Sequence, residues 1–226
     1  MQAIEILSSE DLLQPRTVLE LLTWINQIDA SLSETKASRA QARSGGGPYK
    51  KFREEIRPFS HCIRYADDSG AIVRFPPENH SADIIVESGE KSESFQITLA
   101  SDPKYGEEEA LRMLALSDLG HVPGFWRVRV EGGRASGRFQ VEGRAVGRAR
   151  HAEEVAERTL RAIERKASRQ SDDGMVLIVV VYSPIAAAAM PMIFDLVEQR
   201  QISTPFRQVI LVDDSDRTPP RVIQSR

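Results

Sequence analysis

Three polar side chains occupy positions on two neighbouring predicted strands from which they could act together. Asp83 begins one strand directly after residues 79–82, and Gln96 and Thr98 lie two residues apart on the partner strand. Side chains two residues apart in a strand point to the same face of a sheet. Carboxylate and amide oxygens can ligate Mg²⁺, although an amide brings no charge. The spacing therefore indicates a small, oxygen-rich site on a hairpin.

The placement of these residues resembles the PD-(D/E)XK nuclease superfamily, whose members have the restriction endonuclease-like fold. In that family an Asp begins one strand and Glu-x-Lys lies on the next; the acids hold Mg²⁺ and the lysine activates or orients a water. The resemblance covers about residues 59–212 and includes the basic helix 161–166 before the apolar strand 176–181. It implies a metal-dependent hydrolase of DNA phosphodiester bonds, with Mg²⁺ held by Asp83 and the Gln96 oxygen.

Two departures from the family pattern put catalysis in question. Gln96 replaces the second acid, and Thr98 replaces the lysine and cannot supply a cation. Lys166, from the long predicted helix, is the candidate replacement that would orient the water. Thr98, in the strand, is the other candidate catalytic residue. Glu20 on the first helix, or Glu87, is the candidate second carboxylate.

Each of these residues also has an ordinary structural interpretation. Asp83 can accept backbone hydrogen bonds at a strand end, Thr98 suits a strand, and Lys166 suits a helix C-terminus. The alternative function is therefore a non-catalytic module that binds nucleic acid or protein on the same fold. A small-molecule enzyme of another α/β type is a third reading. Convergence of Asp83, Gln96 and Lys166 within about 5 Å, the range at which charges cooperate, would favour the nuclease.

A basic stretch follows the predicted hairpin region. Between residues 127 and 169 basic side chains outnumber acidic ones by about two to one, although the whole chain has a net charge of −3. Such a surface can contact phosphates, or it can be the solvated rim of a hairpin. The candidate nucleic-acid-binding residues are Arg127, Arg129, Arg138, Arg144 and Arg148.

The composition is that of an ordinary globular protein. Hydrophobic residues make up 41% of the chain and charged residues 28%, which argues against disorder. The single cysteine, Cys62, cannot form an internal disulfide, and no signal peptide begins the sequence. The apolar run 176–194 is interrupted by Pro184 and Pro191, which favours a strand and a helix over a membrane span. We therefore expect a cytoplasmic protein without a membrane anchor.

The periodicity of apolar residues predicts the elements that must position these side chains. A first helix at 16–42 carries an apolar stripe of Leu19, Leu22, Ile25, Ile28 and Leu32, and a Gly-rich linker follows it. Strands are expected at 59–65, 71–75, 82–87, 94–99, 176–182 and 208–212, and helices at 107–119, 152–167 and 190–199. Segments 128–130 and 139–141 read as an inserted hairpin.

Together these elements predict an α/β fold with a mixed sheet, a restriction endonuclease-like sandwich with an N-terminal helix and an inserted hairpin. The expected divisions are a helical arm with its hinge at 1–47, the core at 48–213 and a loose tail at 214–226. The apolar stripe of the arm must bury against something, either across a homodimer or against its own domain.

Overall fold

A computed structural model of the chain describes residues 6–35, 38, 41–42, 46–63, 68–77, 80–100, 126–131, 138–143, 147–169, 174–181, 189–214 and 216–223. Its helices are α1 (Ser9–Leu13), α2 (Val18–Glu34), α4 (Pro48–Lys51), the π-helical turn η1 (Phe52–Ile56), α5 (Arg57–Ile63), α7 (Arg148–Ala167) and α8 (Met190–Glu198). Its strands are β1 (Arg16–Thr17), β2 (Ile72–Arg74), β3 (Ile84–Ser88), β4 (Lys91–Leu99), β5 (Trp126–Glu131), β6 (Arg138–Gly143), β7 (Val176–Val181), β8 (Gln208–Asp213) and β9 (Arg221–Ile223).

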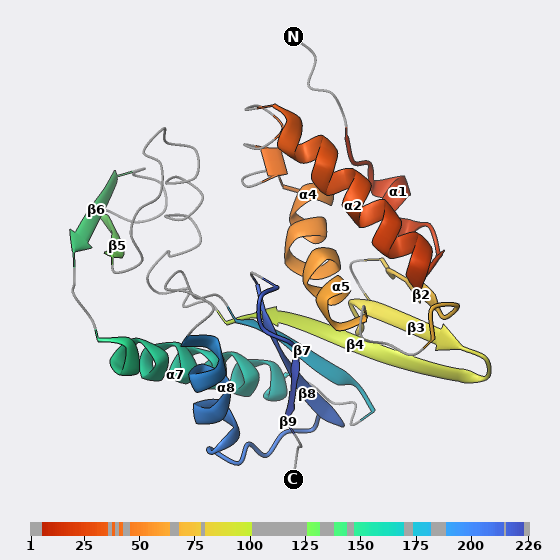
Figure 1. Cartoon of the computed structure of the whole chain (residues 1–226). Helices are drawn as coiled ribbons and strands as arrows, with labels where there is room; N and C mark the ends of the chain where they lie inside the picture. The colour runs from red at the N-terminus through yellow and green to blue at the C-terminus, as the bar shows by residue number, and fades with distance from the viewer. Residues whose placement is uncertain are drawn as a thin grey trace.

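Seven of these strands form one mixed sheet in the order β1-β2-β3-β4-β7-β8-β9 (Figure 1). The neighbours β4, β7 and β8 are parallel, and the other pairs in the sheet are antiparallel. Every residue of β7 is buried, because a central parallel strand is covered on both faces. The sequence prediction of a mixed α/β fold is confirmed, and the predicted central strand is confirmed over Val176–Val181; residue 182 lies outside the described residues.

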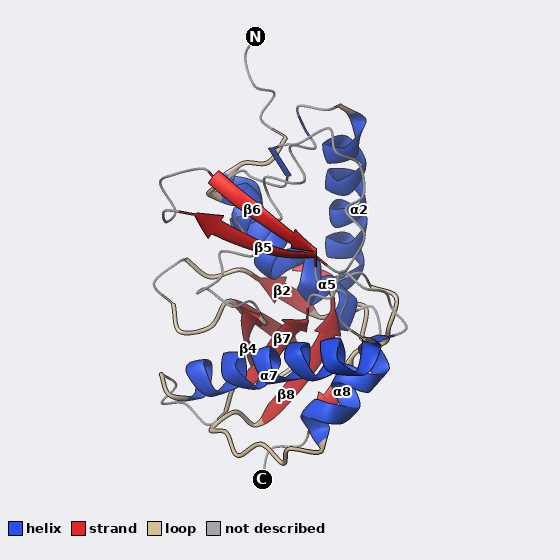
Figure 2. Ribbon diagram, turned by 90° about the vertical axis from the view of Figure 1, so that its left-hand side faces the viewer, coloured by secondary structure: helices blue, strands red, loops and turns tan. Residues whose placement is uncertain are grey.

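Helices cover the two faces of this sheet in separate layers. Figure 2 shows α2 and α5 on one side of the strands and α7 and α8 on the other. Side chains of β7 alternate accordingly: Ile178 packs with the α2 and α5 residues, whereas Leu177 packs with those of α7 and α8. Helix α2, from the predicted arm at 1–47, thus buries its stripe against the chain's own sheet.

Residues 57–63 form helix α5, so the predicted strand at 59–65 is wrong. Helices α4, η1 and α5 follow one another without interruption from Pro48 to Ile63. Phe52, Ile56, Phe59 and Ile63 recur at spacings of four, three and four, which places them on one helical face, and all four are buried. The loose alternation within 59–65 is only the second half of this longer helical pattern.

Helix α2 is shorter than the predicted helix at 16–42, and its buried stripe is shifted. Thr17 caps it at one end, and Thr35, with an extended backbone, ends it at the other. The buried residues are Val18, Leu21, Ile25, Ile28 and Leu32. Leu19, expected in the stripe, is 64% exposed.

The remaining elements agree in part with their predictions. Strands β3 and β4 form the expected hairpin, β5 and β6 form the expected second hairpin, and α8 and β8 lie at their predicted positions. The predicted helix at 107–119 lies outside the described residues. Residues 221–223, within the expected loose tail, form β9 and pair with β8.

In the described segments, no helix has the length and hydropathy needed to cross a bilayer. The apolar run that raised this question is divided between β7 and α8.

Candidate functional site at the start of strand β3

Asp83 lies where β3 begins beside the continuing strand β4. Its backbone N–H donates to the Phe95 carbonyl at 2.9 Å, and its carboxylate Oδ2 accepts from the Ile97 N–H at 2.7 Å. Just before β3 begins, the Asp83 carboxylate therefore accepts the Ile97 N–H that a backbone carbonyl would accept in a continuing antiparallel pair. A hydrogen bond from a neutral N–H to a charged acceptor is stronger than one between neutral groups. Asp83 is thus held firmly in position.

Gln96 and Thr98 lie on the opposite face of β4 from Phe95 and Ile97, which pack under η1 and α5. The Gln96 side chain donates from Nε2 to the Ser81 carbonyl at 2.7 Å. This bond and that of Asp83 join the segment before β3 to the middle of β4. Thr98 is 9% exposed and uncharged, so it brings no cation to the site.

The helix above β4 adds an ion pair to this region. The Lys51 ammonium lies 3.4 Å from Glu55 Oε2, one helical turn away, and donates to the Pro76 carbonyl at 3.2 Å. Pro76 follows strand β2. The ion pair therefore links η1 to the end of β2, next to the start of β3.

Glu55 and Asp83 are close enough to affect one another electrostatically. Burial raises the pKa of the Glu55 carboxyl, the Lys51 ammonium opposes that rise, and the Asp83 carboxylate adds to it. Glu55 Oε2 is a buried atom, and its cationic partner is the Lys51 ammonium at 3.4 Å. The Glu55 carboxylate therefore has one cation beside it, and Asp83 adds to its negative electrostatic surroundings.

Lys51 and Glu55 were missed by sequence reasoning. The signal for them is the helical spacing of Phe52, Ile56 and Phe59, which places residues 51 and 55 together on one side of that helix. The strand interpretation of 59–65 concealed this pattern.

Three residues proposed as replacements for missing site groups have other contacts. The Glu20 carboxylate accepts from the Thr17 backbone N–H at 2.8 Å in the capping box of α2. Glu87 pairs with Arg74 at 2.9 Å. Lys166 lies in the last turn of α7, where its carbonyl accepts helix-end N–H groups. No contact recorded for the described residues joins any of the three to Asp83 or Gln96.

The candidate nucleic-acid-binding arginines are distributed over several elements. Arg127 and Arg129 lie on β5, and Arg138 lies on β6, opposite Glu131. Arg148 is the exposed first residue of α7. Arg144 lies outside the described residues.

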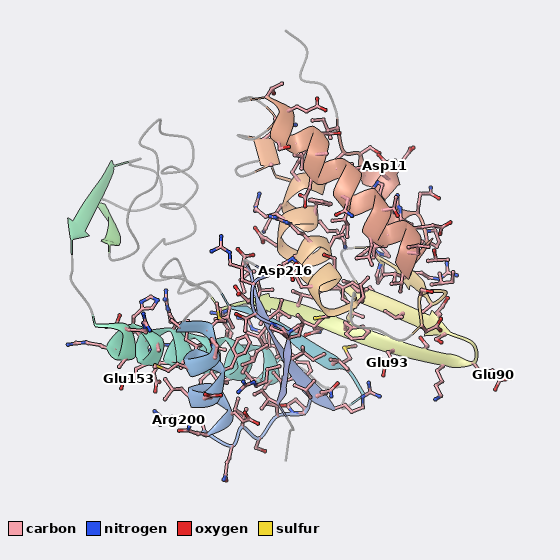
Figure 3. All side chains as sticks on the ribbon, in the orientation of Figure 1. Asp11, Glu90, Glu93, Glu153, Arg200 and Asp216 are labelled. Atoms are coloured by element: carbon pink, nitrogen blue, oxygen red, sulfur yellow. The ribbon has the colours of Figure 1, made fainter. Side chains whose placement is uncertain are left out.

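A second polar cluster surrounds the end of β8. His61 Nδ1 lies 3.2 Å from the Asp213 carbonyl and 3.8 Å from the Asp216 carboxylate; Figure 3 labels Asp216 near α5. Burial raises the pKa of Asp214, whereas the nearby Arg57 and His61 lower it. This network joins α5 to the loop after β8.

Within the ranges that the structure describes, no group of three or more His, Cys, Asp or Glu side chains is arranged to hold a metal ion. A cation at Asp83 and Glu55 would therefore depend on amide, carbonyl, water or substrate oxygens to complete its ligands. Comparisons with family models, curated proteins and solved structures gave no match for this chain.

Proposed function

We propose that this chain is a metal-dependent, nuclease-like protein that hydrolyses DNA phosphodiester bonds on a restriction endonuclease-like fold. The observation that carries the proposal is the Asp83 carboxylate at the start of β3, held at 2.7 Å by the Ile97 N–H. Sequence alone offers Asp83 with only a neutral amide, Gln96, on the partner strand. Glu55 supplies a second carboxylate whose pKa responds to Asp83. Acid pairs of this kind are common at sites that bind cations or transfer protons.

The order of elements supports the fold part of the proposal. A helix, η1 with α5, is followed by the antiparallel strands β2, β3 and β4, then by α7 and the parallel strand β7. The resemblance rests on this order together with an acid at the start of the second of those strands. Asp83 has that place, directly before β3.

The residues at the site fit a small, hard divalent cation. Mg²⁺ is commonly held by one or two carboxylates and completes its shell with water and substrate phosphate oxygens. Asp83 and Glu55 would be those carboxylates. Gln96, the neutral ligand predicted from sequence, lies on the face of β4 away from η1 and donates to the Ser81 carbonyl, so water and phosphate oxygens would complete the shell beside Glu55. The buried Glu55 Oε2, which is paired with the Lys51 ammonium, is the candidate ligand atom of Glu55. Bound there, Mg²⁺ would polarise the phosphate and lower the pKa of a water.

The chain's own residues have separate tasks in this proposal. Asp83 is fixed by the Ile97 N–H, so its second oxygen keeps a constant direction. Lys166 stays a candidate for orienting the attacking water. Arg127, Arg129, Arg138, Arg144 and Arg148 stay candidates for holding the DNA backbone.

The test is cleavage of labelled duplex and single-stranded DNA during titration with Mg²⁺ and Mn²⁺. Asp83→Asn keeps an oxygen that can accept from Ile97 but removes the charge, so cleavage should fall by about a hundredfold or more. Glu55→Gln should lower it by a similar factor, and Glu54→Gln, one residue away, should change it little. Metal-independent cleavage, or an unchanged rate in Asp83→Asn, would disprove the proposed chemistry.

A second candidate function is a non-catalytic module that binds nucleic acid. It is favoured by the hydrogen bonds of Asp83 and Gln96, since both side chains join backbone segments as structural residues do. In that case DNA binding should need no divalent metal, and replacing Arg129 and Arg138 together by alanine should weaken it and reduce its dependence on salt.

A further inference from the structure

A buried histidine joins helix α5 to the loop that follows strand β8. The His61 side chain is 6% exposed, and its Nδ1 lies 3.2 Å from the Asp213 carbonyl oxygen. A carbonyl oxygen only accepts, so Nδ1 carries the hydrogen of this bond, and Nε2 is the nitrogen that gains or loses a proton. The bond to Asp213 is therefore present in both charge states of His61.

The acids of this loop lie around the same histidine. The Asp216 carboxylate is 3.8 Å from His61 Nδ1, and Figure 3 labels Asp216 near α5. Burial raises the pKa of Asp214, and His61 is close enough to lower it. The third acid, Asp213, is 2% exposed and contacts His61 through its carbonyl. A positive charge on His61 is therefore attracted to the loop, and Asp216 is the partner that the distance identifies.

Two charged groups of the helical layer also lie near this contact. Arg57, one turn before His61 in α5, acts on the Asp214 carboxyl as His61 does. The Arg57 guanidinium pairs with Asp29 of α2 at 3.4 Å, and the Arg57 side chain is 51% exposed. Water therefore screens the charge of Arg57 more than it screens that of the buried His61.

The loop itself has a backbone conformation that needs support. Asp216 has a φ of 54°, in the left-handed region that residues other than glycine seldom adopt. Its N–H donates to the Asp213 carbonyl at 3.0 Å, the same oxygen that His61 contacts. Strained conformations persist where surrounding contacts hold them. His61 contacts both ends of this turn and so supplies such a contact.

We propose that His61 is a pH-sensitive latch on the loop after β8: its protonated form holds the loop to α5 through Asp216, and its neutral form holds it only through the Asp213 carbonyl. Burial favours a neutral imidazole, whereas adjacent carboxylates favour a charged one. Opening the loop takes Asp216 away from the ring, so the closed loop binds the His61 proton more tightly than the open loop. The latch is therefore strongest at low pH and weakens as the pH rises through the titration of His61. Because the loop leads to the edge strand β9, the latch sets how readily this edge of the sheet opens.

The experiment measures hydrogen exchange of two loop amides in the full-length protein by nuclear magnetic resonance. The Asp216 N–H donates to the Asp213 carbonyl and the Asp214 N–H to the Val181 carbonyl, so both amides report opening of the loop. Each rate is divided into the intrinsic rate at the same pH to give a protection factor. Protection should be about fivefold higher at about pH 5.5 than at about pH 7.5, the size expected of one partly exposed ion pair. Equal protection at the two pH values, or higher protection at the upper one, overturns the inference.

Three variants assign the pH effect to its groups. Asp216→Asn removes the charge but suits the same backbone conformation, since Asn tolerates a positive φ, and it should abolish the pH dependence. His61→Gln keeps an N–H for the Asp213 carbonyl and should also abolish it. His151→Gln is the matched control, because His151 is also buried but lies in α7 on the other face of the sheet, and it should leave the dependence unchanged. A dependence that survives in Asp216→Asn, or disappears in His151→Gln, overturns the latch.

A titration of the unsubstituted protein covers the case in which a variant does not fold. With ¹³C labelling, the His61 ring and the Asp216 carboxyl carbon should show a common midpoint near neutral pH, because each responds to the charge of the other. An Asp216 carboxyl signal that stays fixed while His61 titrates contradicts the latch. Neither DNA nor metal enters these measurements, so their outcome is separate from that of the proposed function.

Discussion

At the scale of single residues, the candidate site is defined by side chains that also stabilise the fold. Asp83 replaces a ladder acceptor for Ile97, and Gln96 holds the Ser81 carbonyl. Because these bonds fix both side chains in direction, a structural role and a binding role are compatible here. Glu20 differs, since its carboxylate is used within its own helix cap.

The capping role of Glu20 gives a prediction at this scale. Glu20→Ala removes half of a reciprocal capping box and should lower the urea concentration at the midpoint of unfolding. The same change should leave Mn²⁺ affinity unaltered, because no described contact links Glu20 to Asp83. Urea denaturation and the Mn²⁺ titration measure the two effects. A loss of Mn²⁺ affinity with normal stability would return Glu20 to the metal site.

At the scale of elements, two features position the site: the unbroken helical run at 48–63 and the β3–β4 hairpin. The helical run brings Lys51 and Glu55 to the sheet, and the hairpin sets the register of Asp83 against Gln96. In Figure 3 Glu90 marks the tip of the hairpin, at the end away from the start of β3. The turn includes Gly89, whose φ of 59° lies in the left-handed region that favours glycine.

Replacing Gly89 tests how much this turn contributes. Gly89→Ala has space for a methyl group but an unfavourable φ, so it should cost about 1 kcal/mol of stability. Gly46→Ala is the control, because Gly46 also has open space and its φ is not positive. Thermal unfolding of the two variants compares them. Equal melting temperatures would mean that backbone strain at Gly89 does not limit the hairpin.

At the scale of the whole molecule, two layers of helices bury a mixed sheet, and some titratable groups are buried with them. His151, in the first turn of α7, is 8% exposed. Burial lowers the pKa of His151 from 6.5, Arg158 lowers it further, and Glu154 opposes them. The folded protein therefore binds this proton less tightly than the unfolded chain does.

This difference predicts how stability changes with pH. Above about pH 6.5 His151 is neutral in both states and has no effect, and below that pH the unfolded chain is protonated first. Stability should therefore fall as the pH falls from about 6.5 toward the lowered pKa of the folded state. His151→Gln should reduce this fall, as measured by denaturant midpoints between about pH 7.5 and 5.5. An identical pH dependence in the two proteins would assign the effect to other groups.

Elements with local patterns could be predicted from the amino-acid sequence. The β-branched run 176–181 specified a buried strand, the Ser88-Gly89-Glu90-Lys91 turn specified a hairpin, and the stripe of α7 specified its helix. These assignments hold because hydrophobic period and turn chemistry act over a few neighbouring residues. The helix at 57–63 was missed because its period is visible only over the full length of 48–63.

The neighbours of the polar side chains, by contrast, depend on how distant elements pack. Asp83 and Glu55 are 28 positions apart in the chain, and no short-range pattern relates them. Apolar residues on the helical run 48–63 bury against β4, and this packing carries Lys51 and Glu55 to the end of β2, where Asp83 influences the pKa of Glu55. Packing also buries the apolar stripe of α2 against the chain's own sheet. From the sequence, burial across a homodimer and burial against the same domain were both possible.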